Sequence, residues 1–485
     1  MTGQLDRRRF LTGAVTGTAV IAFDTIGRSW VTAAEALPPG AVAVPGLDGD
    51  LVTDPGSLAE AADDFGHIVH HTPVAVLRPG SVRDIVLIVR YANQHGIRVA
   101  MRGQGHTTFG QAQVDGGVVI DSRTLATIHR ISGDRAVVDA GVLWLDLARA
   151  AIADGLTPPV FTDYVGLSVG GTLGCGGIGG TTQHFGLQVD NVLALDVVTG
   201  DGRLVRCSPE ADRRLFEAVL GGLGQFAILV RATIRLVPAP TNARGYQLYY
   251  PDLGSYLADQ RRLLADGRFG SLQGQAIRNA ADTGWEFFVD AAAYYTAPHP
   301  PDDTALVGGL SFGRMAVLEY SFFDWVNRLA PTIEFLKQIG AWGLPHPWLD
   351  VFLPASRTAH IVQSVLADLT LADTGQGPVL LYPFSTGRLH RPFVEMPDED
   401  VAFLFSLLRT AVPPAPDLVA RLVADNRAVY EQARDAGGKR YPIGAVVLSE
   451  ADWRDHYGPD WPAFAAAKAR YDPRHVLTPG QGIFG

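Results

Sequence analysis

The stretch VAVLRPGSVRDIVLIVRYANQHGIRVAMRGQGHTTFGQAQVDGGVVIDSR, residues 74–123, carries the pattern that decides the fold. The runs at 74–79 and 97–103 are short, apolar and rich in β-branched residues, which is typical of buried strands. Between them, residues 81–96 show helical periodicity and end in glycine. A strand, a helix and a second strand in this order predict a domain in which helices cover a sheet.

The helix expected at 81–96 has recognisable ends. Ser81 is a candidate N-cap, because a serine hydroxyl can bond the free backbone N–H groups of the first turn. Gly96 can adopt the left-handed conformation that ends many helices. The face expected to pack on the sheet carries Ile85, Ile88, Val89 and Ala92.

The same texture continues to about residue 240. Further strands are expected at 116–123 and 135–144, a helix at 144–155, and a hairpin at 191–208 around Gly-Asp-Gly. A proline-rich boundary at 237–245 then separates this region from longer amphipathic segments. The sequence therefore predicts an α+β fold with two domains.

The second domain is interpreted as a cap laid over one face of the first. Within it, a helix is expected at 321–340 and strands at 317–323 and 377–385. The last residues return to the glycine and proline style of the first domain, so we expect the C-terminal segment to fold back on it. The expected boundaries are 1–36 for a signal peptide, 37–240 for the first domain, 241–438 for the cap domain and 439–485 for the C-terminal return.

Composition excludes several classes of protein. A net charge of -10 leaves no basic surplus to displace counterions from nucleic acid, so no nucleic-acid partner is expected. Beyond the N-terminal region no apolar run is long enough to span a bilayer, so we expect no stable membrane insertion. Cys175 and Cys207 lack a CxxC neighbour, which argues against zinc, and both are expected to be free. A monomer is the default expectation.

The N-terminal run DRRRFLTGAVTGTAVIAF has the organisation of an export signal. An arginine cluster precedes an apolar stretch, Leu11–Phe23, and small residues follow near Ala34 and Ala36. Adjacent arginines before Phe-Leu indicate the bacterial twin-arginine pathway. The sequence therefore predicts a secreted protein that is exported after folding.

Three glycine-rich segments, 102–113, 168–180 and 221–226, are expected to form loops in the first domain. Glycine lets backbone N–H groups approach and wrap an anion, so these loops favour nucleotide binding. None matches the Rossmann fingerprint or the P-loop. His106 lies in the first segment, where an imidazole could be a metal ligand, a general base or the attachment point of a cofactor.

The quoted stretch resembles the FAD-binding domain of the vanillyl-alcohol oxidase/PCMH superfamily, and within it the cytokinin dehydrogenases. The similarity runs from about residue 60 to the end and implies a PCMH-type FAD-binding domain followed by a substrate-cap domain. Six motifs carry it in the same order, namely FGHIVHHTPVAVLRPGS, FTDYVGLSVGGTLGCGGIGG, QVDNVLALDVVTGDGRLV, LFEAVLGGLGQFAIL, LPHPWLDVFLPASR and YDPRHVLTPGQGIF.

The resemblance implies that FAD is bound covalently, through a bond from His106 to the 8α-methyl carbon of the flavin. No further ligand residues stand at metal spacing, so no metal is expected. Cys175 lies several residues past the position at which bicovalent flavoenzymes attach the flavin a second time, so a single bond between protein and flavin is expected. The other cofactor contacts that the resemblance implies are Met101, Gly103, Gln104, Gly105, Thr107, Gln111, Asp163, Ser168, Gly174, Ile178, Ile228, Tyr441, Thr478 and Gln481.

Asp163 in FTDYVG matches the catalytic aspartate of that family. The resemblance implies that a secondary allylic amine of an adenine cytokinin loses its N–H proton to this carboxylate while hydride passes to flavin N5. The resulting imine then hydrolyses to an aldehyde and a free amine. This chemistry requires a partly desolvated carboxylate close to the ring.

The substrate half departs from the family's pattern. Gln273 stands where the family commonly has glutamate, and Asp350 stands where it has asparagine, whereas Trp348 keeps the aromatic wall. These changes alter which polar groups the pocket can satisfy. Two alternatives therefore stay open: the same flavin chemistry on another amine, an alcohol or a sugar, and a flavin- or ligand-binding protein without turnover. Either oxygen or a quinone can be the electron acceptor.

Overall fold

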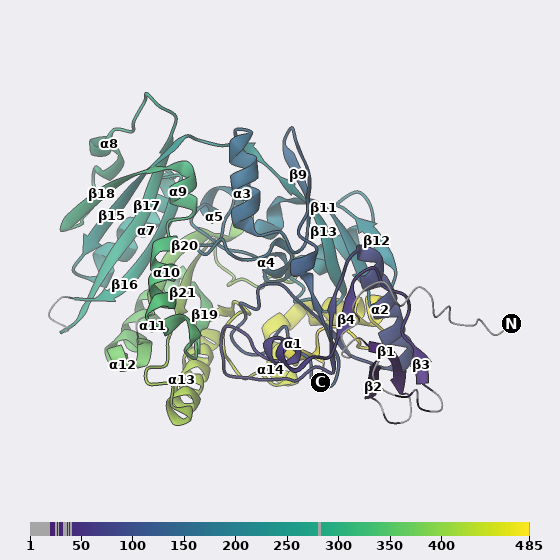
Figure 1. Cartoon of the computed structure of the whole chain (residues 1–485). Coiled ribbons are helices and arrows are strands. Elements are labelled where there is room, and N and C mark those ends of the chain that lie inside the picture. Colours follow the sequence, from purple (N-terminus) through teal and green to yellow (C-terminus); the bar gives the residue numbers. More distant parts are fainter. Residues whose placement is uncertain are drawn as a thin grey trace.

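The computed structural model describes residues 20–24, 27, 29–32, 36, 38, 41–279, 283–375 and 377–484. Figure 1 shows the first domain in purple and blue on one side and the cap domain in teal and green on the other. The arginine cluster of the expected signal peptide and Ala34 lie outside the described residues. No helix in the described part of the chain combines the length and apolar character needed to cross a bilayer.

The end of the expected apolar run belongs to a small antiparallel sheet. Its strands are β1 (Val20–Asp24), β2 (Ser29–Thr32) and β3 (Ala41–Ala43), with β1 in the centre. Phe23 is buried in the same hydrophobic cluster as Ile85 and Val89 of the first domain. This small sheet therefore packs against the first domain, next to helix α2 (Val82–His95).

The predicted strand–helix–strand unit at 74–103 is confirmed. Two of its strands pair in parallel with a common third strand, and α2 (Val82–His95) makes the crossover. Ser81 occupies the N-cap position, but its hydroxyl donates to Asp48 Oδ2 at 2.6 Å and makes no bond to the helix backbone. Gly96 ends the helix with a φ of 63°. The sheet order is β4 (Asp50–Val52), β5 (Ala75–Arg78), β7 (Val118–Asp121) and β6 (Val99–Arg102).

A five-stranded antiparallel sheet completes the first domain. The expected hairpin at 191–208 is confirmed as its first two strands, and the expected helix at 144–155 is α3 (Trp144–Ala153). The strand order is β12 (Leu204–Cys207), β11 (Val192–Thr199), β13 (Ala227–Arg235), β9 (Arg135–Asp139) and β8 (Ile128–Ser132).

The glycine-rich segment 168–180 is only partly a loop, so the expectation for its first half is wrong. Helix α4 runs over Val169–Cys175, and Ser168 at its N-cap accepts a hydrogen bond from the Gly171 N–H at 3.4 Å. A good N-cap and packing against β13 outweigh the low helix propensity of glycine. The loop proper begins at Gly176, where φ is 132°.

The cap domain is an eight-stranded antiparallel sheet covered by α7 (Leu253–Asp266), α11 (Ala355–Asp368) and α13 (Pro416–Asp435). The strands expected at 317–323 and 377–385 are found as β18 and β20. The last strand of the sheet lies just beyond the expected boundary at 438. The order is β18 (Arg314–Ser321), β15 (Asn242–Tyr250), β17 (Trp285–Tyr295), β16 (Ser271–Arg278), β20 (Val379–Ser385), β21 (Val401–Leu407), β19 (Leu349–Pro354) and β22 (Lys439–Arg440).

The single helix expected at 321–340 is wrong, because two shorter helices occupy this region. Helix α9 covers Phe322–Val326, and α10 covers Ala330–Gln338. Pro331 lies in the first turn of α10, where its missing N–H costs nothing, whereas in a continuous helix it would break a hydrogen bond and clash with the preceding turn. Arg328 lies in the break between the two helices, and its side chain points into the protein, where it is mostly buried.

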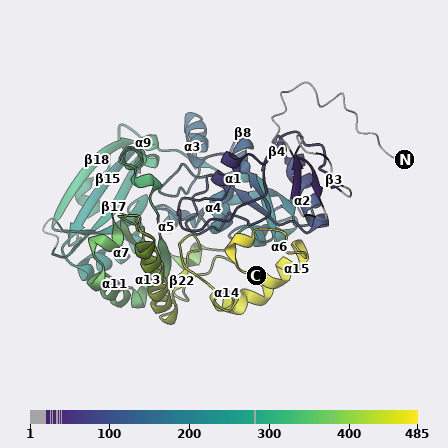
Figure 2. The ribbon, with the colours of Figure 1, turned by 60° about the horizontal axis from the view of Figure 1, so that its bottom comes forward.

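The C-terminal return is confirmed: after β22 the chain packs against the first domain as α14 (Glu450–Tyr457) and α15 (Trp461–Tyr471). Figure 2 shows α15, in yellow, beside α6 (Arg213–Val219). The buried Lys468 ammonium donates to the carbonyls of Gln225 at 3.0 Å and Leu477 at 3.1 Å. Leu477 also forms a parallel bridge with Val99, so the last described segment joins the first sheet.

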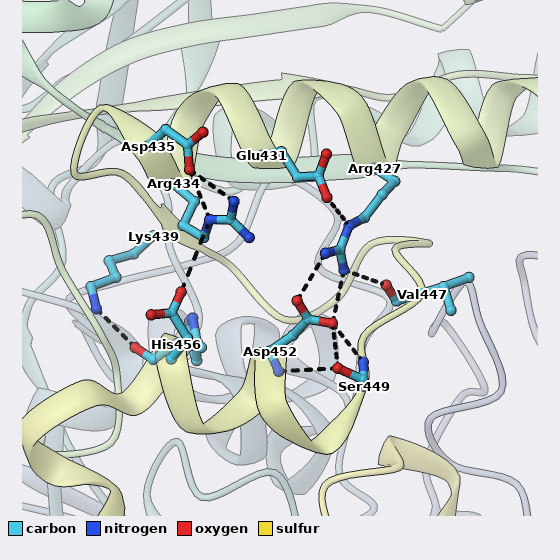
Figure 3. Close-up of polar contacts among 10 residues, drawn as sticks. Arg427, Glu431, Arg434, Asp435, Lys439, Val447, Ser449, Asp452 and His456 are labelled. Carbon is cyan, nitrogen blue, oxygen red and sulfur yellow. Dashed lines mark hydrogen bonds and ion pairs between the residues drawn. The ribbon is translucent and has the colours of Figure 1, made fainter.

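Polar contacts also join the return to the cap (Figure 3). Two nitrogens of Arg427 on α13 lie 2.8 and 3.0 Å from the two carboxylate oxygens of Asp452 on α14. Asp452 in turn forms a capping box with Ser449. The Arg427 guanidinium lowers the pKa of the Asp452 carboxyl well below its usual range, more than burial raises it.

One hydrophobic core connects the two domains and the return. Its buried members include Trp144 and Phe226 of the first domain, Phe352 and Tyr382 of the cap, and Phe464 of α15. A continuous core of this kind holds the domain faces in a fixed relation, so residues far apart in the chain can build one precise cavity.

Candidate active site

A cavity of about 430 Å³ is lined by residues of both domains and of the C-terminal return. Gln273 is the one predicted site residue outside the lining, and it instead contacts Asp163. The predicted residues that the structure brings together on the cavity wall are Met101, Gly103, Gln104, Gly105, His106, Thr107, Gln111, Asp163, Ser168, Gly174, Ile178, Ile228, Trp348, Asp350, Tyr441, Thr478 and Gln481.

Glycines form one wall of this cavity, and their lack of a side chain decides its shape. A Cβ at Gly103 would lie 2.1 Å from Ser168 Oγ, so these two glycine-rich segments can meet only without one. Gly224, with a φ of 70°, similarly approaches Thr478 of the C-terminal return. By contrast, a Cβ at Gly174 would meet no protein atom within 4 Å and would project into open space. The wall therefore exposes backbone to a bound ligand.

His106 lies in an aromatic enclosure. Its ring centroid is 4.2 Å from that of Phe65, 5.1 Å from Tyr164, 5.5 Å from Trp348 and 5.8 Å from Trp342. Burial, helped by repulsion from a second histidine, lowers the pKa of His106 to about 3. The imidazole is therefore neutral at physiological pH, with a nitrogen lone pair available for bonding.

The His106 loop is fixed by a buried carboxylate that sequence reasoning missed. Asp64 Oδ2 accepts hydrogen bonds from Thr107 Oγ1 at 2.9 Å and from the Gly110 N–H at 2.7 Å. Burial raises the pKa of Asp64 to about 6, although these hydrogen bonds oppose the shift. Asp64 precedes Phe65 in the sequence, so one short segment both pins the loop and packs against its imidazole.

Asp163 is held by two side chains from the cap domain. Gln273 Nε2 on β16 donates to Asp163 Oδ1 at 2.6 Å, and Arg328 Nη2 donates to the same oxygen at 3.2 Å. Arg328 Nη2 also donates to Gln273 Oε1 at 2.5 Å. The three side chains form a closed triangle at the edge of the cavity.

Arg328 was not among the residues predicted from sequence. Burial works to lower the pKa of Arg328, but attraction to Asp163 and Asp290 raises it overall, so the guanidinium is charged. A signal was present in WVNRLAP: an arginine between Asn327 and Leu329, three positions before a proline that cannot continue the hydrogen bonding of a preceding helix. Its partners, however, are far away in the chain and have no sequence signature.

Both domains of the chain match known family models. Residues 73–208 match a family model described as an FAD binding domain, and residues 275–484 match one described as cytokinin dehydrogenase 1, FAD and cytokinin binding. The chain is 39% identical to cytokinin dehydrogenase 10 of Oryza sativa subsp. japonica over 486 residues, covering 89% of this chain and 88% of that protein.

The chain belongs to the cytokinin dehydrogenase family. Cytokinin dehydrogenase 4 of Arabidopsis thaliana is 34% identical and covers 90% of this chain, with 92% of its own length matched. An uncharacterized oxidoreductase, ORF5 in the fasciation locus of Rhodococcoides fascians, is 42% identical over 90% of this chain and 99% of its own length. As a member of this family, the chain is an FAD-dependent oxidoreductase acting on CH–NH groups.

A solved structure supports the fold of this cytokinin dehydrogenase family member. The chain superposes on 6-hydroxy-D-nicotine oxidase from Arthrobacter nicotinovorans with a TM-score of 0.67, covering 89% of this chain and 96% of that one. Sequence identity between them is 23%. The likeness confirms the α+β PCMH-type architecture that the sequence predicted.

The residues on the cavity wall fit FAD. The glycine segments present backbone without side chains, as a pyrophosphate requires. Gln481 Oε1, on the C-terminal return, is buried and has no hydrogen-bond partner among the described residues. A buried polar atom without a partner costs roughly 1–3 kcal/mol, which a hydrogen-bonding ligand would recover.

The cap contributes two more unpaired polar atoms, on the side expected to receive substrate. Trp348 Nε1 and Asp350 Oδ2 are buried, line the cavity and lack partners within the described residues. Asp350 Oδ1 accepts a hydrogen bond from Ser406 Oγ at 2.6 Å. Burial raises the pKa of Asp350 to about 7, against the lowering effects of Ser406 and of Arg440. A donor and an acceptor are therefore available to orient a polar ring.

Both cysteines are free in the structure, as expected. Cys175 lines the cavity at the end of α4, and burial raises the pKa of its thiol to about 11. At physiological pH it is a neutral thiol and a poor nucleophile. Among the described residues, the cavity lining thus includes a neutral imidazole, His106, and a carboxylate, Asp163, whose two cap-domain partners bind one oxygen.

Proposed function

We propose that this oxidoreductase cleaves the N6-alkyl side chain of adenine cytokinins, with FAD tethered to His106 and with Asp163 as the proton acceptor. The observation that carries the proposal is the placement of Asp163: it lines the same cavity as His106 and the glycine wall, and both its cap-domain partners bind one oxygen. The relatives named cytokinin dehydrogenase support the substrate class.

FAD, when bound, supplies the acceptor for the hydride that leaves the substrate carbon. The chain's own residues then have three tasks. Asp163 Oδ2 accepts the N–H proton of the amine while Oδ1 stays bonded to Gln273 and Arg328. Trp348 supplies an aromatic wall and an N–H donor for the ring. Leu329, Ile333, Leu380 and Leu404 line the cavity and exclude water from the reacting atoms.

The tether is supported by the state of His106. A nucleophile must be unprotonated, and burial keeps this imidazole neutral. The tilted ring of Phe65 and the stacked ring of Trp342 restrict its motion, while the bonds from Thr107 and Gly110 to Asp64 hold the loop. An imidazole so fixed can approach one edge of a bound flavin with little further loss of conformational entropy.

Turnover tests the proposed substrate. The purified yellow protein is mixed with isopentenyladenine and either a quinone or a dye acceptor, and release of aldehyde and adenine is followed. We expect both products in equal amounts. A flavin-loaded protein that releases neither product from any cytokinin would refute the substrate assignment.

The tether is tested separately by mass. Acid-precipitated and washed protein should stay yellow, and the intact chain should carry the added mass of FAD. His106→Ala should remove both signals, whereas His346→Ala, which removes another buried imidazole stacked on Phe65, should keep them. Unchanged added mass in His106→Ala would exclude this attachment point.

A second substrate class is favoured by the cap. Asp350 is a carboxyl group and Gln273 an amide, so the pocket differs in charge from the pattern expected of cytokinin dehydrogenases. Another amine, an alcohol or a sugar could satisfy Asp350 Oδ2. Anaerobic bleaching of the flavin by a panel of amines, alcohols and sugars distinguishes the two: bleaching by cytokinins alone excludes this second class.

We also propose export by the twin-arginine pathway, on the basis of the sequence DRRRFL and the apolar run after it. The test is secretion from a bacterial host of the full chain and of a variant with Arg7→Lys and Arg8→Lys. Export is expected to stop in the variant, while a standard Sec-dependent reporter is still exported. Equal secretion of both forms would contradict the proposal.

A further inference from the structure

We propose that Arg328 is a positioning residue of the reaction: from the break between α9 and α10 it binds one oxygen of Asp163 and so leaves the other oxygen free for the substrate proton. This inference rests on the proposed role of Asp163 and adds a residue that the resemblance to known families did not supply. It also assigns a function to the helix break itself.

The hydrogen bonds around Asp163 are one-sided. Gln273 Nε2 at 2.6 Å and Arg328 Nη2 at 3.2 Å both bind Oδ1. Among the described residues no side chain or backbone donor is found on Oδ2. A carboxylate with one oxygen fully engaged has a fixed orientation, and its second oxygen can face a substrate in the cavity.

Arg328 itself is firmly held. Its guanidinium carbon lies 4.5 Å from the centroid of the Trp325 ring, and Nη1 donates to the Trp325 carbonyl at 3.4 Å. On the other side, Nε lies 3.8 Å from Asp290 Oδ2 on β17. The side chains of Arg328 and Asp290 are each 16% exposed. The planar fork of arginine holds its N–H donors in fixed directions, whereas a lysine ammonium carries three rotatable donors on a single atom.

The charges explain why a cation is needed here. Arg328 lies between two carboxylates, Asp163 and Asp290, while Gln273 adds no charge. Removing the guanidinium would leave two partly buried negative groups facing each other without compensation, which favours proton uptake. The other titratable groups around this cluster are Tyr294 on β17, Tyr320 on β18, Tyr382 on β20 and the Glu334–Lys337 pair on α10.

The helix break is what makes the contact possible. Arg328 follows the C-cap of α9 at Asn327 and precedes α10. Leu329 at the N-cap of α10 lines the cavity together with Thr332 and Ile333 of that helix. A continuous helix would turn residue 328 through regular helical steps and fix its direction by periodicity. The break frees this position to reach β16 and the Asp163 loop at the same time.

The experiment compares Arg328→Gln, Arg328→Lys and a control, Arg314→Gln. The control removes another cap-domain ion pair: Arg314 on the edge strand β18 places its Nη2 2.6 Å from Glu286 Oε2 on β17. Each full-length, flavin-loaded protein is assayed for kcat, KM and the pH dependence of kcat/KM, and its flavin content and melting temperature are measured.

For Arg328→Gln we expect flavin to be retained, kcat to fall about 10–100-fold, and the acid limb of the pH profile to move up by about one pH unit. Arg328→Lys should lose several-fold in kcat but keep the acid limb, because it restores the charge without the fork. Arg314→Gln should match the wild type in flavin content, in kcat and in the acid limb of the pH profile. Wild-type kcat and pH profile in Arg328→Gln would overturn the inference.

Two further measurements test the role of Arg328 if Arg328→Gln fails to fold or if cytokinins are not the substrate. If Arg328→Gln does not fold, Arg328→Lys decides: an unchanged kcat there would overturn the inference. If no cytokinin is oxidised, the proposed function fails on its own. A crystal structure of the Gln or Lys variant then tests Arg328 without turnover, where an undisturbed Asp163–Gln273 pair in the wild-type orientation would overturn the positioning role.

Discussion

The two walls of the cavity are built in opposite ways. The proposed cofactor wall is made of backbone: Gly103 lies against Ser168 and Gly224 against Thr478 because neither glycine has a side chain, and Gly174 leaves space open. The catalytic wall is made of side chains, and Asp163 meets Gln273 and Arg328 from positions 110 and 165 residues away in the chain. A wall made of backbone can be predicted from runs of glycine in the sequence, whereas a wall made of side chains from distant positions can be recognised only in the folded structure.

The largest expected effect is on the catalytic wall. Asp163→Asn keeps the shape and the bond from Arg328 but removes the proton acceptor, so kcat should fall by roughly 10²–10⁴-fold. The cofactor wall is untouched, so the protein should stay yellow. Steady-state turnover and the visible spectrum check this. Wild-type turnover in the variant would show that Asp163 has no chemical role in the reaction.

The next effect concerns Asp350, where a buried carboxyl stands on the cap side. Its folded pKa of about 7 lies above the value near 4 of an unfolded chain, so its contribution to stability is present below pH 4 and is lost as pH rises through 7. Asp350→Asn should therefore raise the free energy of unfolding at pH 8 by roughly 1–4 kcal/mol and leave it unchanged at pH 4. Denaturant unfolding at both pH values measures it, and the exposed Asp146→Asn serves as control.

Gly174→Ala tests whether the glycine wall of the cavity contacts the cofactor. In the protein alone the new methyl group meets nothing within 4 Å, and alanine favours the helix α4 by up to about 1 kcal/mol. In the loaded protein the same methyl group would occupy cofactor space. We expect an equal or higher melting temperature for the apoprotein but a flavin content lowered about tenfold. A fully loaded variant would show that this wall does not contact the cofactor. Gly46→Ala, which also meets no neighbour, is the matched control.

The smallest effect lies outside the cavity, at the junction of α13 and α14. Asp452→Asn removes one charge from the pair with Arg427, which is partly exposed, so the loss of stability should be only about 1 kcal/mol. The lowered pKa of Asp452 means that the pair stabilises the protein above the unfolded pKa near 4 and loses this effect as pH falls. Thermal melts at pH 7 and at a series of lower pH values should show a difference between variant and wild type that is full at pH 7 and shrinks as pH falls below about 4. A loss of several kcal/mol in the free energy of unfolding would mean that docking of the whole C-terminal return depends on this ion pair.

The sequence therefore allowed prediction of much of the first domain and of the cofactor wall. The helix at 81–96 has clear apolar periodicity and a glycine stop, and the glycine segments mark close backbone approach. The break at Arg328 was missed because apolar periodicity continues across it and only Pro331 signals the interruption. Asp64 and Arg328 escaped notice because a single charged residue gains meaning only when its distant partners are in place.

The position of the C-terminal return has a consequence for how the protein is made. Tyr441, Thr478 and Gln481 complete the cavity, and Leu477 joins the first sheet only when α15 is in place. A ribosome has synthesised His106 long before these residues exist. We therefore expect flavin binding to wait until the polypeptide up to Gln481 has left the exit tunnel, and nascent or shortened chains that stop before it should be colourless.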